Sequence, residues 1–104
     1  MSNVTIELWV WFGKDLKEDF RPISEICFVR EEEIREGTTV RQLLKDLAKR
    51  YQSIAENVFD MRTNCLHPHM LLTYNDKIIN LNTVYEKVLQ GGDKIKILPL
   101  IGGG

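Results

Sequence analysis

The sequence predicts an α+β fold in which one main helix packs against one face of a mixed sheet of about four to five strands. Three observations carry this prediction. Residues 3–12 alternate apolar and polar side chains, residues 39–52 repeat apolar side chains at helical spacing, and residues 94–101 form a second β-type segment, KIKILPLI. A strand or helix with one apolar face must bury that face against another element, so the helix is expected to cover the sheet.

The first predicted strand has a period of two, which is typical of a sheet with one buried face. Its inward row comprises Val4, Ile6, Leu8, Val10 and Phe12. Trp9 and Trp11 fall on the opposite row. An exposed aromatic patch on that row would mark an interaction surface, whereas a loop folded over it would make it structural.

Residues 13–22 are polar and are bounded by glycine and proline, so they predict a hairpin loop. We expect the acidic side chains of this loop, Asp15, Glu18 and Asp19, to be solvated. The returning strand is predicted over residues 23–35.

The main helix is the strongest local signal. Its apolar side chains recur at three- and four-residue intervals and form one face: Val40, Leu43, Leu44, Leu47, Ala48 and Tyr51. Thr39 followed by Gln42 is a capping box that places the start of the helix.

The second half of the chain is less regular. Residues 53–69 show no clear period, residues 70–74 read as a short strand, and Thr83 with Glu86 resembles a second capping box before a short helix over 84–89. The resulting order of hairpin, helix, strand, short helix and strand is the β-grasp arrangement, with the last strand beside the first.

Composition and charge exclude several classes of function. The net charge is −1 and no basic stripe stands out, so nucleic-acid binding is not expected. No segment resembles a signal peptide or a membrane span, and two cysteines, Cys27 and Cys65, are too few for a disulfide framework. A cytoplasmic protein with no membrane association is the default expectation.

One histidine-rich segment contains residue types that can bind a metal ion. Cys65, His67 and His69 follow one another at two-residue spacing. A zinc site needs about three or four protein ligands and the chain has no second cluster, so we expect a polar loop and no metal. A β-grasp ferredoxin is excluded because an iron–sulfur cluster needs four cysteines.

Two segments resemble the MoaD/ThiS family of ubiquitin-like sulfur carriers. Residues 36–51 (EGTTVRQLLKDLAKRY) resemble the turn and helix of that family, and residues 89–104 (LQGGDKIKILPLIGGG) resemble its ending. The central residues 71–81 are also similar, with Asn75 at the turn. Within the family, the proline shortly before the terminal glycines makes this chain most similar to the small subunit of molybdopterin synthase. That subunit usually has two prolines there, whereas here Pro99 is followed by Leu100.

The resemblance implies a ubiquitin-like β-grasp domain over residues 1–101 and a flexible glycine tail over 102–104. It also implies a carrier without catalytic residues of its own. The Gly104 carboxylate, next to Gly103, would be adenylated by an E1-like adenylyltransferase that uses ATP. Sulfur from a sulfurtransferase donor would then give a thiocarboxylate, which serves an acceptor such as the large subunit of molybdopterin synthase. The chain itself has no phosphate-binding glycine loop, so we expect it to bind no cofactor.

The residues just before the last two glycines and the two tryptophans on the outer row of the first strand are the expected partner-binding set: Gly102, Ile101, Leu100, Pro99, Leu98, Trp9 and Trp11. Glycine lacks a Cβ atom, so a glycine tail can enter a narrow tunnel and leave its terminal carbonyl open to attack. Two alternatives to the molybdopterin carrier stay open at this point. One is a carrier for the thiazole of thiamine, and the other is a ubiquitin-like modifier that joins Gly104 to amines of target proteins. A plain interaction module with an idle tail is a third.

Overall fold

The computed structural model describes residues 2–10 and 14–100. The strands in this part of the chain are β1 (Ser2–Trp9), β2 (Arg21–Ser24), β3 (Cys27–Ile34), β4 (Phe59–Asp60), β5 (Cys65–Leu66), β6 (Met70–Tyr74), β7 (Lys77–Ile78) and β8 (Lys94–Pro99). The helices are the 3₁₀ helix η1 (Lys14–Leu16) and the α-helices α1 (Val40–Arg50), α2 (Gln52–Asn57) and α3 (Leu81–Val84).

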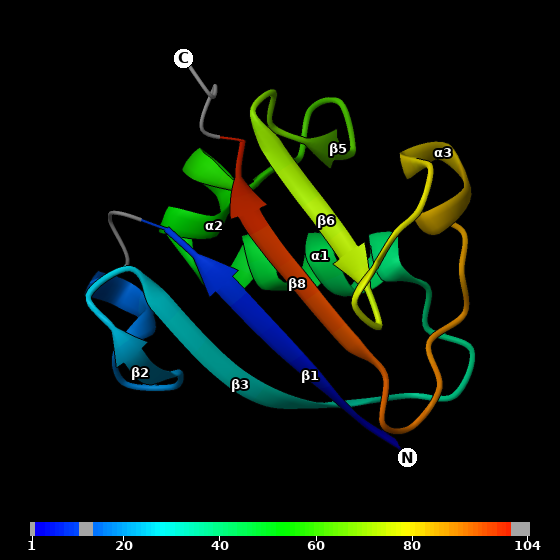
Figure 1. The fold of residues 1–104 in the computed structure, drawn as a ribbon, viewed down its shortest axis with the longest axis horizontal. Helices are drawn as coiled ribbons and strands as arrows, with labels where there is room; N and C mark the ends of the chain where they lie inside the picture. The colour runs from blue at the N-terminus through cyan, green and yellow to red at the C-terminus, as the bar shows by residue number, and fades with distance from the viewer. Residues whose placement is uncertain (1, 11–13, 101–104) are drawn as a thin grey trace.

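The main sheet has six strands in the order β2-β3-β1-β8-β6-β7, and β4 pairs with β5 separately. β1 is antiparallel to β3 and parallel to β8, so the first and last strands are central neighbours (Figure 1). The predicted β-grasp topology is therefore confirmed. The sheet is larger than the expected four to five strands because the short segments β2 and β7 pair at its two edges.

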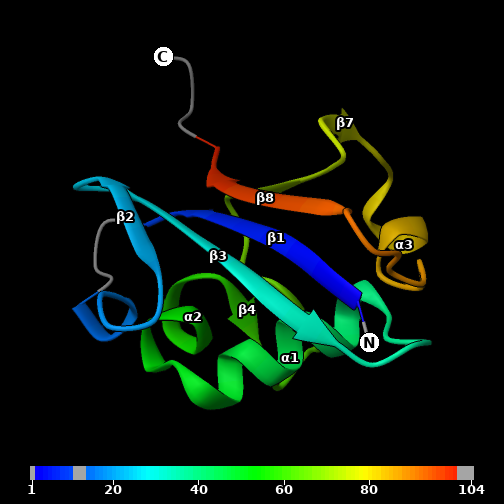
Figure 2. The same cartoon turned by 90° about the horizontal axis from the view of Figure 1, so that it is seen from below.

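The core lies between the sheet and helices α1 and α2, which occupy the same side of the sheet (Figure 2). Ile6 of β1 and both Ile95 and Ile97 of β8 are fully buried there. Burying each of these side chains contributes about 1.5–3 kcal/mol. The alternation of side chains along β8 then directs Lys94, Lys96 and Leu98 to the opposite face of the sheet.

Helix α1 begins where the sequence predicts. The Thr39 hydroxyl accepts a hydrogen bond from the Gln42 N–H at 3.2 Å, and the Gln42 side chain accepts one from the Thr39 N–H at 3.0 Å. This capping box satisfies two amide groups that the first helical turn would leave unpaired. The predicted apolar face is buried. The helix ends at Arg50 because Tyr51 is extended, with φ −126° and ψ 115°.

Residues 14–26, which precede β3, form more regular structure than the predicted hairpin loop. They contain η1 and the edge strand β2, which pairs with β3. Leu16 and Phe20 are buried in the core, and the Phe20 ring packs edge-on against the Tyr51 ring with centroids 5.5 Å apart. These two side chains anchor the segment. The predicted strand over residues 23–35 is divided in the structure, since its first residues end β2 and a turn at 25–26 precedes β3.

Asp15, Glu18 and Asp19 are exposed, as expected, but two of them also accept hydrogen bonds from distant parts of the chain. The Asp15 carboxylate accepts a hydrogen bond from the Ser53 N–H at 2.9 Å, at the first turn of α2. The Asp19 carboxylate accepts one from the Tyr51 hydroxyl at 2.7 Å. Carboxylates that bond to distant parts of the chain tie this segment to the helical layer.

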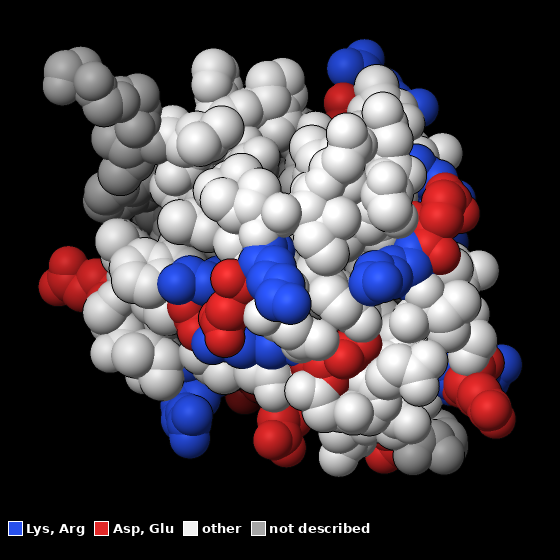
Figure 3. Space-filling view, turned by 45° about the vertical axis from the view of Figure 1, so that its right-hand side comes forward, with Lys and Arg blue, Asp and Glu red and all other residues white. Residues whose placement is uncertain are grey.

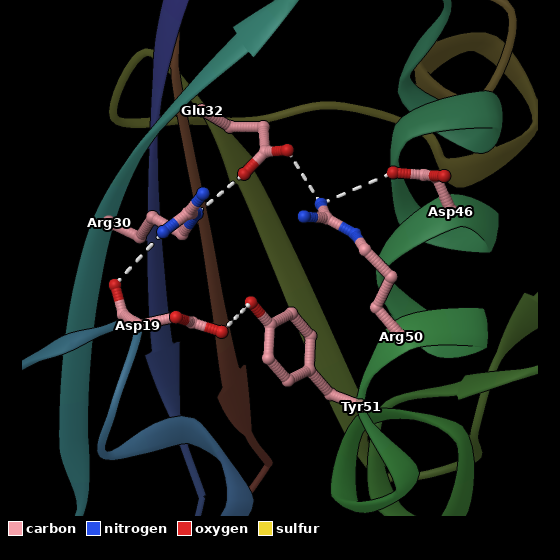
Figure 4. Close-up of polar contacts among 6 residues, drawn as sticks. All are labelled: Asp19, Arg30, Glu32, Asp46, Arg50 and Tyr51. Carbon is pink, nitrogen blue, oxygen red and sulfur yellow. Dashed lines mark hydrogen bonds and ion pairs between the residues drawn. The ribbon is translucent and has the colours of Figure 1, made fainter.

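Asp19 also belongs to a larger polar network that joins β3 to α1 (Figure 4). Glu32 is only 8% exposed and lies between two guanidinium groups, those of Arg30 and Arg50, each at 2.6 Å. Arg50 additionally pairs with Asp46 at 3.2 Å. A buried carboxylate needs such partners, because an unpaired charge away from water is costly.

Two further elements differ from the expectation. Residues 53–69, which show no period, contain most of α2 and the β4–β5 pair. These elements are too short for a periodic signal. Helix α3 begins with Asn80 as its cap, whose side chain accepts a hydrogen bond from the Asn82 N–H at 2.8 Å. The capping box predicted at Thr83 and Glu86 is therefore wrong.

Candidate functional site

The predicted site residues divide into two groups. Trp11, Ile101, Gly102, Gly103 and Gly104 lie outside the described residues. Trp9, Leu98, Pro99 and Leu100 are described, and they lie at the end of the sheet where β8 finishes. The candidate site is therefore built from the last residues of β1 and β8 and the segments that flank them.

The strand pairing sets the position of the last described residues. β6 and β8 are antiparallel, with Leu71 opposite Leu98 and Met70 opposite Pro99. Leu98 and Pro99 are half-buried, whereas Leu100 is 56% exposed. We refer to residues 98–100 as the tail root, since the three glycines follow shortly after them in the sequence.

A groove of about 380 Å³ lies beside the tail root. Trp9 and Val10 of the β1 end line one part of it, and Pro99 of β8 lines another. The remaining lining comes from residues 56–57 and 67–70. The structure thus brings Trp9 and Pro99 together, two residues that the sequence placed in the partner-binding set separately.

The outer face of the sheet fixes the Trp9 ring by polar contacts. The indole N–H of Trp9 donates a hydrogen bond to a Glu7 carboxylate oxygen at 2.6 Å. The ammonium group of Lys96 lies 5.5 Å from the centre of the Trp9 ring, within the range of a cation–π contact. Trp9 is half-buried by these neighbours, so its ring is held in place while part of it stays accessible.

Glu7 is the centre of this cluster. Lys94 and Lys96 lie 3.6 Å and 3.7 Å from its carboxylate. Burial alone would raise the pKa of Glu7, but the hydrogen bond from Trp9 and the two lysines together outweigh it and lower that pKa. Glu7 is therefore charged at neutral pH and orients both the indole and the two ammonium groups.

The surface around the cluster changes character along the strands. Figure 3 shows a band of basic and acidic side chains, with a largely uncharged surface above it toward the end where β8 finishes. Leu71, Leu98 and Met70 are half-buried members of the paired strands in that direction. An apolar surface with a charged border is the usual composition of a protein-binding site.

The histidine-rich segment does not form a metal site in the described part of the chain. The His67 Nε2 atom lies 2.8 Å from the Ala55 carbonyl oxygen, a contact that ties the segment to α2. Cys65 is half-buried in β5. Within the described residues, no group of three or more histidine, cysteine, aspartate or glutamate side chains could hold a metal ion.

Sequence reasoning missed the supporting residues of this site. Glu7 and Trp9 are two residues apart on one strand, so the alternation that places Trp9 on the outer face also places Glu7 there. The sequence alone therefore indicates that Glu7 shares a face with Trp9. The role of Lys96 depends on its pairing opposite Glu7 across the parallel β1–β8 ladder, which only the tertiary structure gives.

Among the described residues, no helix has the length and apolar character needed to cross a membrane. The model of the ThiS family matches residues 19–104, which is most of the chain and includes its three final glycines.

The chain belongs to the ThiS family.

Solved structures agree with this assignment at the level of the fold. Small archaeal modifier protein 1 of Haloferax volcanii is similar to this ThiS-family chain with a TM-score of 0.65 and 17% identity, over 97% of this chain and all of the other. The Haloferax volcanii HVO 2177 protein gives 0.61 and 16%, over 99% and 89%. A Pyrococcus furiosus protein assigned as subunit 1 of molybdopterin converting factor gives 0.59 and 18%, over 97% and 100%. No curated protein matches the sequence.

Proposed function

We propose that this ThiS-family chain is a sulfur carrier whose reactive group is the carboxylate of Gly104, and that it serves molybdopterin biosynthesis. One observation carries the proposal. The family match extends through Gly104, so the terminal glycines lie within the matched region. The proline before them, Pro99, is the feature that favours the molybdopterin role.

The proposed chemistry takes place at the end of the backbone. A carboxylate is a poor electrophile until ATP converts it to an acyl adenylate, with release of pyrophosphate. A donor persulfide then attacks the acyl carbon and displaces AMP. This step forms a C–S bond and keeps the S–S bond of the persulfide. A thiol then attacks the donor's sulfur, forms a disulfide with the donor and leaves the thiocarboxylate on Gly104. Each of these steps needs access to the terminal carbonyl and none needs a side chain of the carrier.

The roles of the carrier and of its partner enzymes follow from this chemistry. We propose that an E1-like adenylyltransferase binds the ATP and that a sulfurtransferase supplies the persulfide. A sulfur acceptor, such as the large subunit of molybdopterin synthase, uses the product. The carrier supplies the tail and a docking surface, binds no cofactor of its own and has no catalytic side chain.

The docking surface supports the proposal by its position. Fixing the backbone of a residue in one conformation costs about 1–2 kcal/mol in entropy, and this cost applies to each tail residue that a partner orders. The partner must offset this cost by contacts elsewhere on the carrier. The groove with Trp9 and Pro99 lies directly beside the tail root, and Trp9 is held by Glu7 and Lys96 before any partner arrives. Preorganised aromatic side chains are common binding hot spots.

A modifier function uses the same activation and differs in the acceptor. The similarity of the fold to small archaeal modifier protein 1 is the observation that favours this alternative. In that case a lysine amine of a target protein would attack the activated Gly104 carbonyl and form an isopeptide bond. A carrier for the thiazole of thiamine would keep the thiocarboxylate and change only the acceptor enzyme.

ATP–pyrophosphate exchange with a candidate adenylating enzyme tests the activation step. We expect exchange to depend on the carrier and to disappear when Gly103 and Gly104 are deleted. The same reaction, supplied with cell extract and analysed on a denaturing gel, separates the two functions. Ladders of modified proteins would support the modifier, and their absence together with sulfur incorporation would support the carrier. Full biological activity of the deletion variant would contradict both.

A further inference from the structure

Hydrogen bonding between the β6 and β8 segments continues one residue beyond the last strand pair, which is Met70 with Pro99. Pro99 lies opposite Met70 but has no N–H group, so it cannot donate to the ladder. Leu100 provides the next donor: its N–H donates a hydrogen bond to the carbonyl oxygen of His69 at 2.5 Å. We call this hydrogen bond the tail latch. It holds the chain to the sheet through residue 100, four residues before Gly104.

The carbonyl that accepts this hydrogen bond is itself fixed. His69 has φ +79°, in the left-handed region that few residues other than glycine adopt. The Met70 N–H donates to the His67 carbonyl at 3.2 Å, which closes the turn around His69. Such a conformation persists only where the surrounding structure holds it.

Two contacts of His67 anchor the turn to the helical layer. Its N–H donates to the Val58 carbonyl at 2.8 Å, and its Nε2 atom contacts the Ala55 carbonyl oxygen at 2.8 Å. The turn over residues 67–70 also lines the groove beside Trp9. The tail latch therefore connects the tail root to the same rigid segment that forms the candidate docking groove.

We infer that the tail latch is a positioning device, in which His69 and Leu100 set where the tail leaves the sheet relative to the docking groove. This inference rests on the proposed function, because it concerns delivery of Gly104 to an activating partner. A tail root that is ordered before binding has less freedom to lose when the partner binds. Proline at position 100, which the small subunit of molybdopterin synthase usually has, would have no N–H and could not form the tail latch, so the inference concerns this chain and not that subunit.

The choice of variants follows from the donor. Leu100→Pro removes the N–H and keeps an apolar side chain. Proline at position 100 also suits the extended backbone expected of the residue before it, Pro99. His67→Phe keeps an aromatic ring and loses the contact with the Ala55 carbonyl, so it loosens the turn from a distance. Leu100→Ala keeps the N–H and measures the contribution of the side chain.

The functional readout is the steady-state adenylation of the full chain. We expect Leu100→Pro to raise the KM for the carrier by about two- to tenfold, the size of one net hydrogen bond, with kcat little changed. His67→Phe should raise KM less. His67 also lines the docking groove, so His67→Phe keeps any direct effect on docking when L100P is present. In a double-mutant cycle, the effect of His67→Phe should be smaller with L100P than without it, because the part that acts through the hydrogen bond is already lost. An effect of His67→Phe that is as large with L100P as without it, or an unchanged KM for L100P, would overturn the inference.

Amide hydrogen exchange gives an independent readout that needs no partner. We expect the Leu100 amide of the free carrier to exchange more slowly than an unstructured amide, and His67→Phe to accelerate it. Exchange of the Leu100 amide at the unstructured rate would overturn the tail latch whatever the function. A wild-type chain that shows this protection but is not adenylated by any candidate enzyme would overturn the proposed function instead.

Discussion

The Tyr74 hydroxyl donates a hydrogen bond to the Asp93 carboxylate and thereby joins the end of β6 to the residue before β8. Asp93 is 8% exposed and also accepts hydrogen bonds from the Gln90 N–H at 2.8 Å and from the Asn75 side chain at 3.1 Å. This carboxylate organises the turn that carries Gly92 at φ +88°. It therefore fixes where β8 begins, and β8 in turn carries the tail root.

Asp93 predicts a specific dependence of stability on acid. Burial alone would raise the pKa of Asp93, but the hydrogen bonds from Tyr74, Gln90 and Asn75 outweigh it and lower the pKa. A lowered pKa in the folded state means that the ionised group stabilises the fold above the ordinary aspartate pKa of about 3.9. That stabilisation is lost as the pH falls through the lower value in the folded state.

We expect Asp93→Asn to destabilise the protein by about 1–3 kcal/mol at pH 7, since it removes charge-assisted hydrogen bonds. The difference from wild type should shrink as the pH is lowered through the acid range, because wild type then loses the same charge. Urea unfolding at pH 7 and at acid pH measures this. Exposed Glu36→Gln is the matched control, and a gap between Asp93→Asn and wild type that does not change with pH would contradict the account.

Tyr74 predicts a second effect at alkaline pH. Burial and the hydrogen bond to Asp93 raise the pKa of Tyr74 to about 12. A raised pKa in the folded state means that the neutral phenol stabilises the fold fully below the ordinary tyrosine pKa of about 10, and that this stabilisation is lost as the pH rises toward 12. The ultraviolet difference between wild type and Tyr74→Phe should show the phenolate near pH 12. Ionisation near the ordinary value in the folded protein would contradict it.

The segment between β1 and β3 should contribute stability through Asp15. Its carboxylate accepts the hydrogen bond from the Ser53 N–H and so caps α2 from 38 residues away. Asp15→Ala should cost about 1 kcal/mol, as the loss of a helix cap does, and Asp15→Asn should cost less because it retains an acceptor. Thermal or urea unfolding measures both. Glu18→Ala, in the same segment and exposed, is the control and should have little effect.

These contacts show why parts of the fold could be predicted and others could not. Helix α1 could be predicted from local sequence, because its apolar face and its capping box lie within one continuous segment. Helix α2 depends on Asp15, which is distant in sequence, and has only six residues. The same holds for the site. Strand alternation points to Trp9 and the resemblance to the family's ending points to Pro99, but the groove between them and the support of Lys96 arise only when β8 pairs beside β1.

Trp9 should be a hot spot for the adenylating partner. Trp9→Ala should weaken binding by about 2 kcal/mol or more, which is roughly 30-fold, because it removes a large side chain that is already held in place. Isothermal titration or surface binding with the partner measures this. Ile78→Ala is the matched control, because Ile78 is also apolar and is 71% exposed on edge strand β7. Equal losses for the two variants would contradict a docking surface at Trp9.

The mass of the intact chain tests the central claim most directly. The chain is incubated with ATP, its adenylating enzyme and a sulfur donor, and is then analysed by mass spectrometry with fragmentation of the C-terminal peptide. The account predicts a mass increase equal to the replacement of one oxygen by sulfur, located at Gly104 and absent when one residue is added after it. An unchanged mass, or sulfur found elsewhere in the chain, would contradict the account.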